Sequence, residues 1–174
     1  MKRILSALFL ALISTTLLAQ NCSIKFKVTD AEDGSILDDA EIMEDGNTIK
    51  KTINGEALLG GRSCAVSKFK ICKSGYQTVA NYSAEAREVP VEHTVKLINL
   101  TRLQANIFKK LESEEATGII NIKEISEWSR KLINGYKDSD DKENLKSCKE
   151  RMKLEVAELV DKKLITRKEG RDIF

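Results

Sequence analysis

The spacing of apolar residues changes once along this chain, and that change limits what each half can form. From Ser23 to Ile98 apolar residues recur at every second position, the pattern of strands with one buried face. After Asn99 they recur three and four positions apart, as on one face of a helix. The sequence therefore predicts an α+β fold: a small antiparallel β-sandwich of about seven strands, immunoglobulin-like or transthyretin-like, followed by a small all-α domain of helical hairpins.

Turn-forming dipeptides separate the expected strands at intervals of about 8 to 12 residues, as in small sandwiches. These dipeptides are Asp33-Gly34, Asp45-Gly46, Asn54-Gly55, Gly60-Gly61 and Ser74-Gly75. The last strand shows the alternation most clearly. Its expected inward residues are Val89, Val91, His93, Val95 and Leu97.

Helix-boundary signals divide the second half of the chain. Gly118 is expected to end a first helix whose inward stripe is Leu100, Leu103, Ile107 and Leu111. Asn121 and Glu124 form a capping-box pattern for a second helix, which Asn134-Gly135 is expected to end. The second helix is expected to bury Ile122, Ile125, Trp128 or Ser129, and Leu132. A third helix follows, and its expected buried stripe is Leu145, Cys148, Met152, Val156 and Leu159. A short fourth helix is expected after Thr166.

The first 19 residues have the pattern of a secretory signal peptide. Lys2 and Arg3 precede an apolar run from Ile4 to Leu18, and Ala19 offers a small residue for cleavage. We therefore expect a signal peptide over 1–19, a β-sandwich domain over 20–99 and a helical domain over 100–174. The protein is expected to be secreted or periplasmic, without a transmembrane anchor, because the apolar run is short for a stable span.

The charge of the mature chain argues against a nucleic-acid partner. Cleavage after Ala19 leaves 27 of the 29 basic side chains, against 27 acidic ones. A net charge near zero gives no long-range attraction to a polyanion. The basic residues of the third helix also alternate with acidic residues, as on a solvated helix face.

Four cysteines in an exported chain are candidates for disulfide bonds. They are Cys22, Cys64, Cys72 and Cys148. Four cysteines allow three pairings, and we expect Cys22 to pair with Cys64 or with Cys72. A zinc site is not expected, since no C-x-x-C occurs and His93 is the single histidine. Cys22 is not expected to carry a lipid, because Asn21 stands where a lipoprotein has a small residue.

The first half resembles a known family of sandwich domains. The residues that carry the resemblance are Asp30, Asp33-Gly34, Leu37, Ala40, Ile42, Thr52, Gly55, Ala57, Phe69, Ile71, Lys73, Gly75-Tyr76, Val95 and Leu97. Over about residues 22–98 they resemble the carboxypeptidase regulatory-like domain, a transthyretin-like sandwich. Ile36 and Asp39 depart from that pattern, where proline and glycine are usual. The resemblance implies an accessory module of exported bacterial proteins, with no catalytic residues.

A second resemblance covers the first helical hairpin, over residues 103–133. Its pattern consists of Leu111, Gly118, Ile119, Ile120, Glu124, Lys131 and Leu132. This arrangement of helix, Gly-Ile turn and helix is similar to the short C-terminal domain found at the ends of bacterial proteins. The resemblance implies at most a role in assembly.

No residue set has the pattern of an active site. His93 lacks a neighbouring nucleophile motif, so we interpret it as a packed histidine. The acidic run 138–141 lacks the glycine and glutamate that a calcium loop needs, so we interpret it as a helix start. Trp128, Tyr76 and Tyr82 could form a small binding platform, although helical spacing favours the core for Trp128.

We therefore expect a non-catalytic binding or structural module of the bacterial cell envelope, with no cofactor and no metal. Its partner is expected to be a protein or another envelope component. Two alternatives stay open: an accessory or hydrolase-associated subunit, and a component that oligomerises through its helical domain.

Overall fold

The computed structural model describes residues 21–174, so the predicted signal peptide, residues 1–19, lies outside the described residues. By their internal contacts these residues form two compact units. The first unit comprises residues 21–29, 34–71 and 79–96. The second comprises residues 30–33, 72–78 and 97–174.

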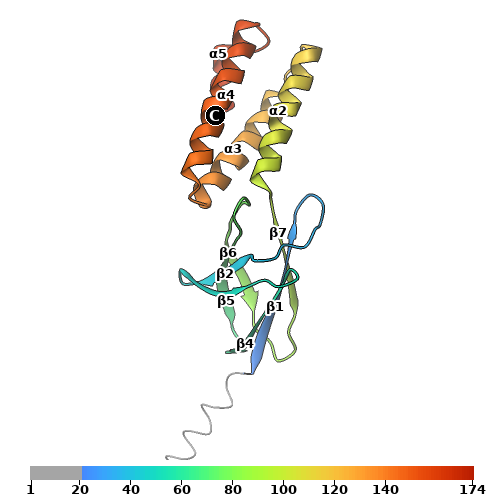
Figure 1. The fold of residues 1–174 in the computed structure, drawn as a ribbon, viewed down its shortest axis with the longest axis vertical. Helices are drawn as coiled ribbons and strands as arrows, with labels where there is room; N and C mark the ends of the chain where they lie inside the picture. Colours follow the sequence, from blue (N-terminus) through green and yellow to red (C-terminus); the bar gives the residue numbers. More distant parts are fainter. Residues whose placement is uncertain (1–20) are drawn as a thin grey trace, which may run out of the picture. The chain divides into compact units, whose positions relative to one another are not determined.

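In residues 21–174, seven strands form two sheets, which confirms the β part of the predicted fold (Figure 1). They are β1 (Cys22–Asp30), β2 (Glu41–Glu44), β3 (Asn47–Lys51), β4 (Glu56–Arg62), β5 (Val66–Cys72), β6 (Val79–Glu85) and β7 (Glu92–Leu97). One sheet has the order β4-β1-β7 and the other has the order β3-β2-β5-β6. The pairs β1–β4, β2–β3 and β5–β6 are antiparallel.

Alternate residues of β1 build the core between the two sheets. Ile24, Phe26 and Val28 are fully buried, while the intervening residues are partly exposed. The ring of Phe26 packs edge-on against Phe69 of β5, with centroids 5.2 Å apart. This contact joins the inner faces of the two sheets, as the period of two predicts.

The last strand is shorter than the alternation of apolar residues predicts. It begins at Glu92, and Val89 and Val91 are 79% and 43% exposed rather than inward. Pro90 lies between these two valines and has no backbone N–H for a strand ladder, so the pairing begins only after it. The inward assignment of Val95 and Leu97 is confirmed.

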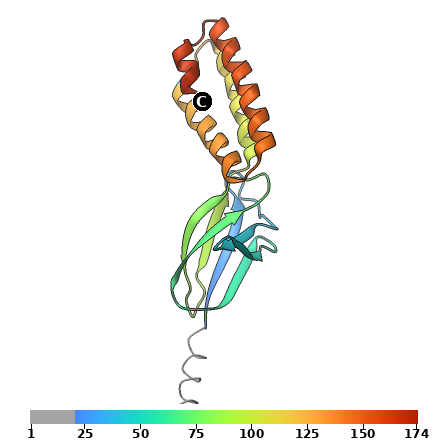
Figure 2. The ribbon, with the colours of Figure 1, turned by 90° about the vertical axis from the view of Figure 1, so that its left-hand side faces the viewer.

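Within the described part of the chain, four helices follow the strands and form the helical part of the α+β fold (Figure 2). They are α2 (Leu100–Thr117), α3 (Ile122–Asp138), α4 (Lys142–Asp161) and α5 (Arg167–Asp172). Helix α3 packs against α2, α4 and α5. The shared core is Leu100, Ile107, Phe108, Leu111, Ile125, Leu132, Tyr136, Cys148, Met152, Val156, Leu159, Ile165 and Ile173. No helix in residues 21–174 is long and apolar enough to cross a membrane.

The helix boundaries follow the sequence signals at most positions. Gly118, at φ 74°, ends α2, and Thr166 with Glu169 forms a complete capping box for α5. At the start of α3, the side chain of Asn121 accepts from the backbone of Glu124 at 3.3 Å, as predicted. The backbone N–H of Asn121, however, donates to Glu114 of α2 at 2.7 Å instead of to Glu124.

Gly135 does not end α3, which continues to Asp138. A Cβ atom on Gly135 would collide with the Leu100 side chain of α2. The glycine therefore serves close packing of two helices rather than a turn, and the sequence signal for a helix end was wrong here.

A disulfide joins Cys22 to Cys64, with the two Cα atoms 5.2 Å apart. This is one of the two pairings expected for Cys22, and Cys72 is not part of it. Cys148 is not disulfide-bonded: it lies in the core of the helical unit, where its Sγ is 3.7 Å from Met152 Sδ. Its position on the buried stripe of α4 explains why it packs as an apolar residue.

Candidate functional site

A groove with a volume of about 760 Å³ opens between α2 and α4 of the helical unit. This α2–α4 groove is lined by Thr101, Gln104, Ala105, Phe108, Lys109, Glu112, Glu115, Tyr136, Asn144, Arg151 and Glu155. The lining residues that belong to α2 recur three or four positions apart, so they form one stripe beside the buried stripe of that helix. The groove thus borders the helical core and belongs to a single unit.

Two aromatic residues form the floor of the groove. Phe108 and Tyr136 are 8% and 4% exposed. The guanidinium of Arg151 lies over the Phe108 ring, with its carbon 3.9 Å from the ring centroid, which is a favourable cation–π geometry. Both rings are therefore nearly buried, with the Arg151 cation packed against the face of Phe108.

The hydroxyl of Tyr136 donates a hydrogen bond to Gln104 Oε1 at 2.8 Å. Burial, together with the negative charges of Cys148 and Asp141 when ionised, raises the pKa of Tyr136 to about 12. The phenol thus stays protonated at neutral pH and keeps its role as a donor. This bond ties α3 to α2 at the floor of the groove.

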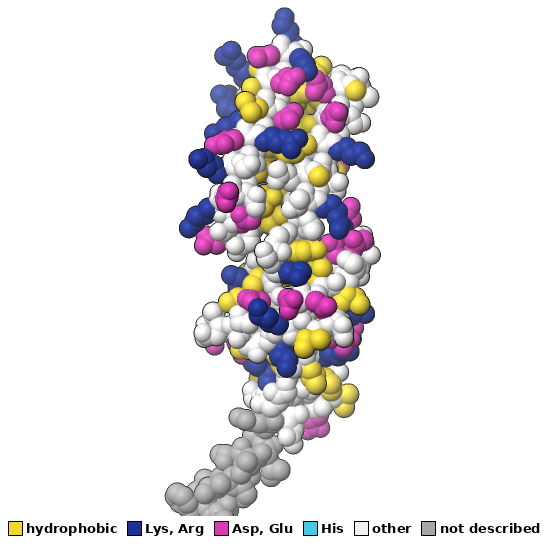
Figure 3. Space-filling view, viewed as in Figure 1, with side chains coloured by type: hydrophobic (Ala, Val, Ile, Leu, Met, Phe, Trp, Pro, Cys, Tyr) yellow, Lys and Arg dark blue, Asp and Glu magenta, His cyan; other side chains and the backbone are white. Residues whose placement is uncertain are grey.

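Charges of both signs line the walls. Lys109 and Arg151 are cationic, and the acidic residues are Glu112, Glu115 and Glu155. The ammonium group of Lys162 bonds Glu115 of α2 and Glu158 of α4, and these bonds raise its pKa. Figure 3 shows the same mixture of basic and acidic side chains over the visible face of the helical unit.

Lys109 and Glu112 differ from the other charged lining residues. Both are exposed, and neither has an ion-pair partner among residues 21–174. They lie three positions apart, hence on the same face of α2. A bound partner would therefore meet one cation and one carboxylate that form no ion pair among the described residues.

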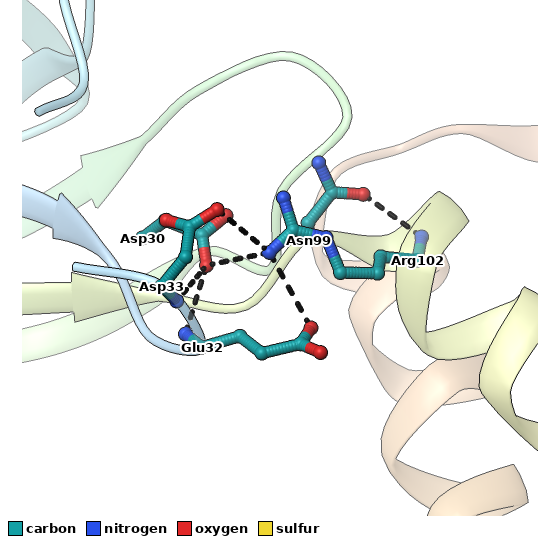
Figure 4. A network of polar contacts seen from close by, with 5 residues as sticks. All are labelled: Asp30, Glu32, Asp33, Asn99 and Arg102. Carbon is teal, nitrogen blue, oxygen red and sulfur yellow. Dashed lines mark hydrogen bonds and ion pairs between the residues drawn. The ribbon is translucent and has the colours of Figure 1, made fainter. Parts of the chain in front are cut away.

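A second polar cluster surrounds Arg102 in the first turn of α2 (Figure 4). Its guanidinium lies 3.3 Å from Asp30, 3.4 Å from Glu32 and 3.1 Å from Asp33. The side chain of Asn99 caps the same helix by accepting from the Arg102 backbone at 2.9 Å. A cation already surrounded by three carboxylates holds a loop against a helix end, so we interpret this cluster as structural.

Asp30 is the buried member of that cluster, with a side chain 1% exposed. Its Oδ1 also accepts from the backbone of Glu32 at 2.8 Å, an Asx turn. The sequence signal for Asp30 was only its match to a family pattern. Nothing in the sequence connects it with Arg102, which lies 72 positions away.

His93 lies in an aromatic cluster of the sandwich, away from any nucleophile pattern. Its ring centroid is 5.9 Å from that of Phe26 and 6.1 Å from that of Tyr82. Its Nε2 is buried and has no hydrogen-bond partner among the described residues. The contacts are those of a packing residue.

The other sequence candidates have local structural roles. Asp141 accepts from the Asn144 backbone at 3.2 Å and so caps α4, in agreement with a helix start at the acidic run. Trp128 is partly buried against the helical core, with Ser129 fully buried beside it. Residues 21–174 contain no group of three or more His, Cys, Asp or Glu side chains that could hold a metal ion.

Comparison with known proteins identifies no family for this chain. No protein-family model and no curated protein matches it. One similar solved structure is the Bacillus anthracis TIE protein, with 18% sequence identity and a TM-score of 0.36. The match covers 45% of this chain and 16% of that protein's length.

Proposed function

We propose that this chain is an exported, non-catalytic binding module of the cell envelope, and that the α2–α4 groove holds a segment of a protein partner. The observation that carries this proposal is the composition of the groove. An aromatic floor lies between walls with charges of both signs, and Lys109 and Glu112 lack partners among the described residues.

A polypeptide segment suits this lining better than a small molecule. The volume lies within the range of small-ligand sites, but such sites are lined mostly by apolar side chains. Here hydrogen-bonding and charged groups are spread along two helices. Polar and charged groups of this kind are typical of the rim of a protein interface.

Two features support export. Residues 1–19 have the composition of a signal peptide, and the Cys22–Cys64 disulfide is a bond typical of oxidising compartments. N-terminal sequencing of the protein recovered from the envelope or the medium tests this part. We expect a start near Gln20 to Cys22. An intact Met1 on the mature protein would contradict export with cleavage.

The sandwich supports an accessory role within this proposal. Its resemblance to the carboxypeptidase regulatory-like domain rests on residues such as Gly55 and the Gly75-Tyr76 pair. Asn54 and Gly55 both have positive φ, 52° and 70°, as a two-residue hairpin turn requires. The hairpin from α2 through Gly118 to α3 is likewise the segment that resembles the short C-terminal domain.

Helix-mediated oligomerisation is the second candidate function. It is favoured by Ile119, which is 75% exposed in the turn between α2 and α3. A dimer that buries this turn would dissociate in an Ile119→Lys variant, as size-exclusion chromatography with light scattering would show. A monomeric wild type at micromolar concentration would exclude this candidate.

Site-specific photo-crosslinking tests the groove. A photoreactive side chain at Glu112, inside the groove, is compared with one at Glu150, an exposed glutamate of α4 outside the lining. We expect a crosslinked protein adduct in cells that export the chain from position 112 and none from position 150. The Lys109→Glu change should weaken that adduct, and the same charge change at Lys146, outside the groove, should leave it intact.

Equal crosslinking from both positions, or none from either, would contradict the groove as the partner site.

The proposal that the protein is not an enzyme has its own test. Purified mature protein should give no turnover with ester, peptide or glycoside substrates. A turnover that follows the protein through purification and disappears in a folded His93→Gln variant would overturn it.

A further inference from the structure

A small hollow lies between α4 and α5, separate from the α2–α4 groove. Its volume is about 360 Å³. Val156, Ala157 and Val160 of α4 form its apolar floor, and Gly170 and Phe174 border it from the other side. We call it the α4–α5 hollow; it shares no lining residue with the groove.

Gly170 lets α5 approach α4 closely at the edge of this hollow. A Cβ atom at this position would lie 2.8 Å from Val156 Cγ1, so the two helices approach where no side chain intervenes. The capping box of Thr166 and Glu169 fixes the start of α5. Ile165 and Ile173 are buried in the core below, so the hollow lies on a fixed helical framework.

The rim of the hollow is strongly cationic for a chain of balanced charge. Lys153, Arg167 and Arg171 line it, against the single carboxylate side chain of Asp161. All three cations are exposed, and none has an ion-pair partner among the described residues. By contrast, Arg151 of α4 and Lys162, the residue after that helix, are paired with glutamates.

We infer that the α4–α5 hollow binds an amphiphilic anion, a single alkyl chain ending in a carboxylate. The apolar floor of Val156, Ala157 and Val160 would take the chain. The unpartnered cations of the rim would take the carboxylate, for which the arginine guanidinium offers two parallel donors. The volume lies in the range of small-ligand sites.

Charge and shape both select this occupant. A simple inorganic anion would leave the apolar floor exposed to water, and an alkyl cation would meet three like charges. The carboxylate amphiphile uses both parts of the surface.

Isothermal titration calorimetry of the mature chain tests this inference, with decanoate below its micelle concentration as the probe. Two matched probes accompany it: decyltrimethylammonium, which has the same chain and the opposite charge, and acetate, which has the charge without the chain. We expect saturable binding of decanoate alone. Equal binding of decyltrimethylammonium would overturn the inference, because it would show apolar association without charge recognition.

Two variants localise the binding. Ala157→Trp fills the hollow from an exposed position of α4, and Arg171→Glu reverses a rim charge. Each should weaken decanoate binding at least tenfold. The matched controls, Ala116→Trp on α2 and Lys146→Glu on α4, lie outside the hollow and should bind as the wild type does.

Circular dichroism checks that each variant is folded. If Ala157→Trp does not fold, the result with Arg171→Glu decides. Wild-type affinity in folded Arg171→Glu would overturn the inference. Binding of the chain to anionic phospholipid vesicles without saturable decanoate binding would also overturn it, in favour of a membrane surface.

Discussion

The guanidinium of Arg102 lies 3.3 Å from Oδ1 of Asp30, whose side chain is 1% exposed. A buried carboxylate is costly without a cation or sufficient hydrogen bonds, and its other oxygen, Oδ2, has no hydrogen-bond partner among the described residues. Glu32 and Asp33 add negative charge around the same guanidinium. Arg102 therefore stabilises the 30–33 loop against the first turn of α2.

Replacing Arg102 with Met should lower the free energy of unfolding, because the buried carboxylate of Asp30 loses its cation. The expected loss is below that of a fully buried pair, because Arg102 is 35% exposed. Urea unfolding measures it, and Arg167→Met, at an exposed arginine without an ion pair, is the control with little expected effect. In the Arg102→Met background, Asp30→Asn should cost less than in the wild type. Additive losses would contradict a direct coupling between the two side chains.

The Cys22–Cys64 disulfide should contribute about 4 kcal/mol to stability through the entropy of the unfolded chain, because the bridged residues are 42 positions apart. Reduction, or the Cys22→Ser change, should clearly lower the melting temperature of the sandwich. Peptide mapping without reductant checks the pairing and should recover a fragment that joins Cys22 to Cys64. A fragment joining Cys22 to Cys72 would contradict the structure.

Gly135→Ala should destabilise the helical unit by about 1 to 3 kcal/mol, although alanine favours helices. The added methyl group would collide with Leu100 across the α2–α3 contact. Asn134→Ala is the matched control: its position is exposed in the same helix, and the change should be neutral or slightly stabilising. Thermal melts followed by circular dichroism compare the two. Stabilisation by Gly135→Ala would contradict the packing role of this glycine.

Much of the fold could be predicted from local signals. The change of apolar period near Asn99 separates strands from helices, and Gly118 and Thr166 mark real helix boundaries. These signals succeed because capping and periodicity depend on residues close in sequence. Gly135 shows where they fail. A glycine that serves a contact with Leu100, 35 residues earlier, looks in the sequence like one that ends a helix.

The groove and the hollow could not be predicted from the sequence, because both depend on which helices lie side by side. The α2 stripe containing Lys109 and Glu112 looks like an ordinary solvated helix face until α4 is placed beside it. Likewise, the sequence does not reveal that Arg167 and Arg171 form no ion pair among the described residues, or that they border the same hollow as Val156 and Val160 of α4. Periodicity predicts which face of a helix is buried, but it does not predict the hollows between helices.

Tyr136 makes stability depend on pH in the alkaline range. Burial is the largest cause that raises its pKa from 10.0 to about 12. The folded state thus holds a proton that the unfolded state loses above pH 10. The contribution of Tyr136 to the free energy of unfolding is therefore complete below pH 10. It is lost as the pH rises from 10 to 12, which lowers that free energy by at most about 2 to 3 kcal/mol.

Tyr136→Phe tests this pH dependence. The variant should lose about 1 kcal/mol at pH 7, with the hydrogen bond to Gln104, and its stability should fall less steeply between pH 10 and 12 than that of the wild type. Tyr76→Phe, at a tyrosine outside the helical core, is the control and should keep the wild-type slope. Urea unfolding at pH 7, 10 and 11 measures all three proteins. An unchanged slope in Tyr136→Phe would show that other groups cause the alkaline loss, and that the buried phenol does not couple the floor of the groove to pH.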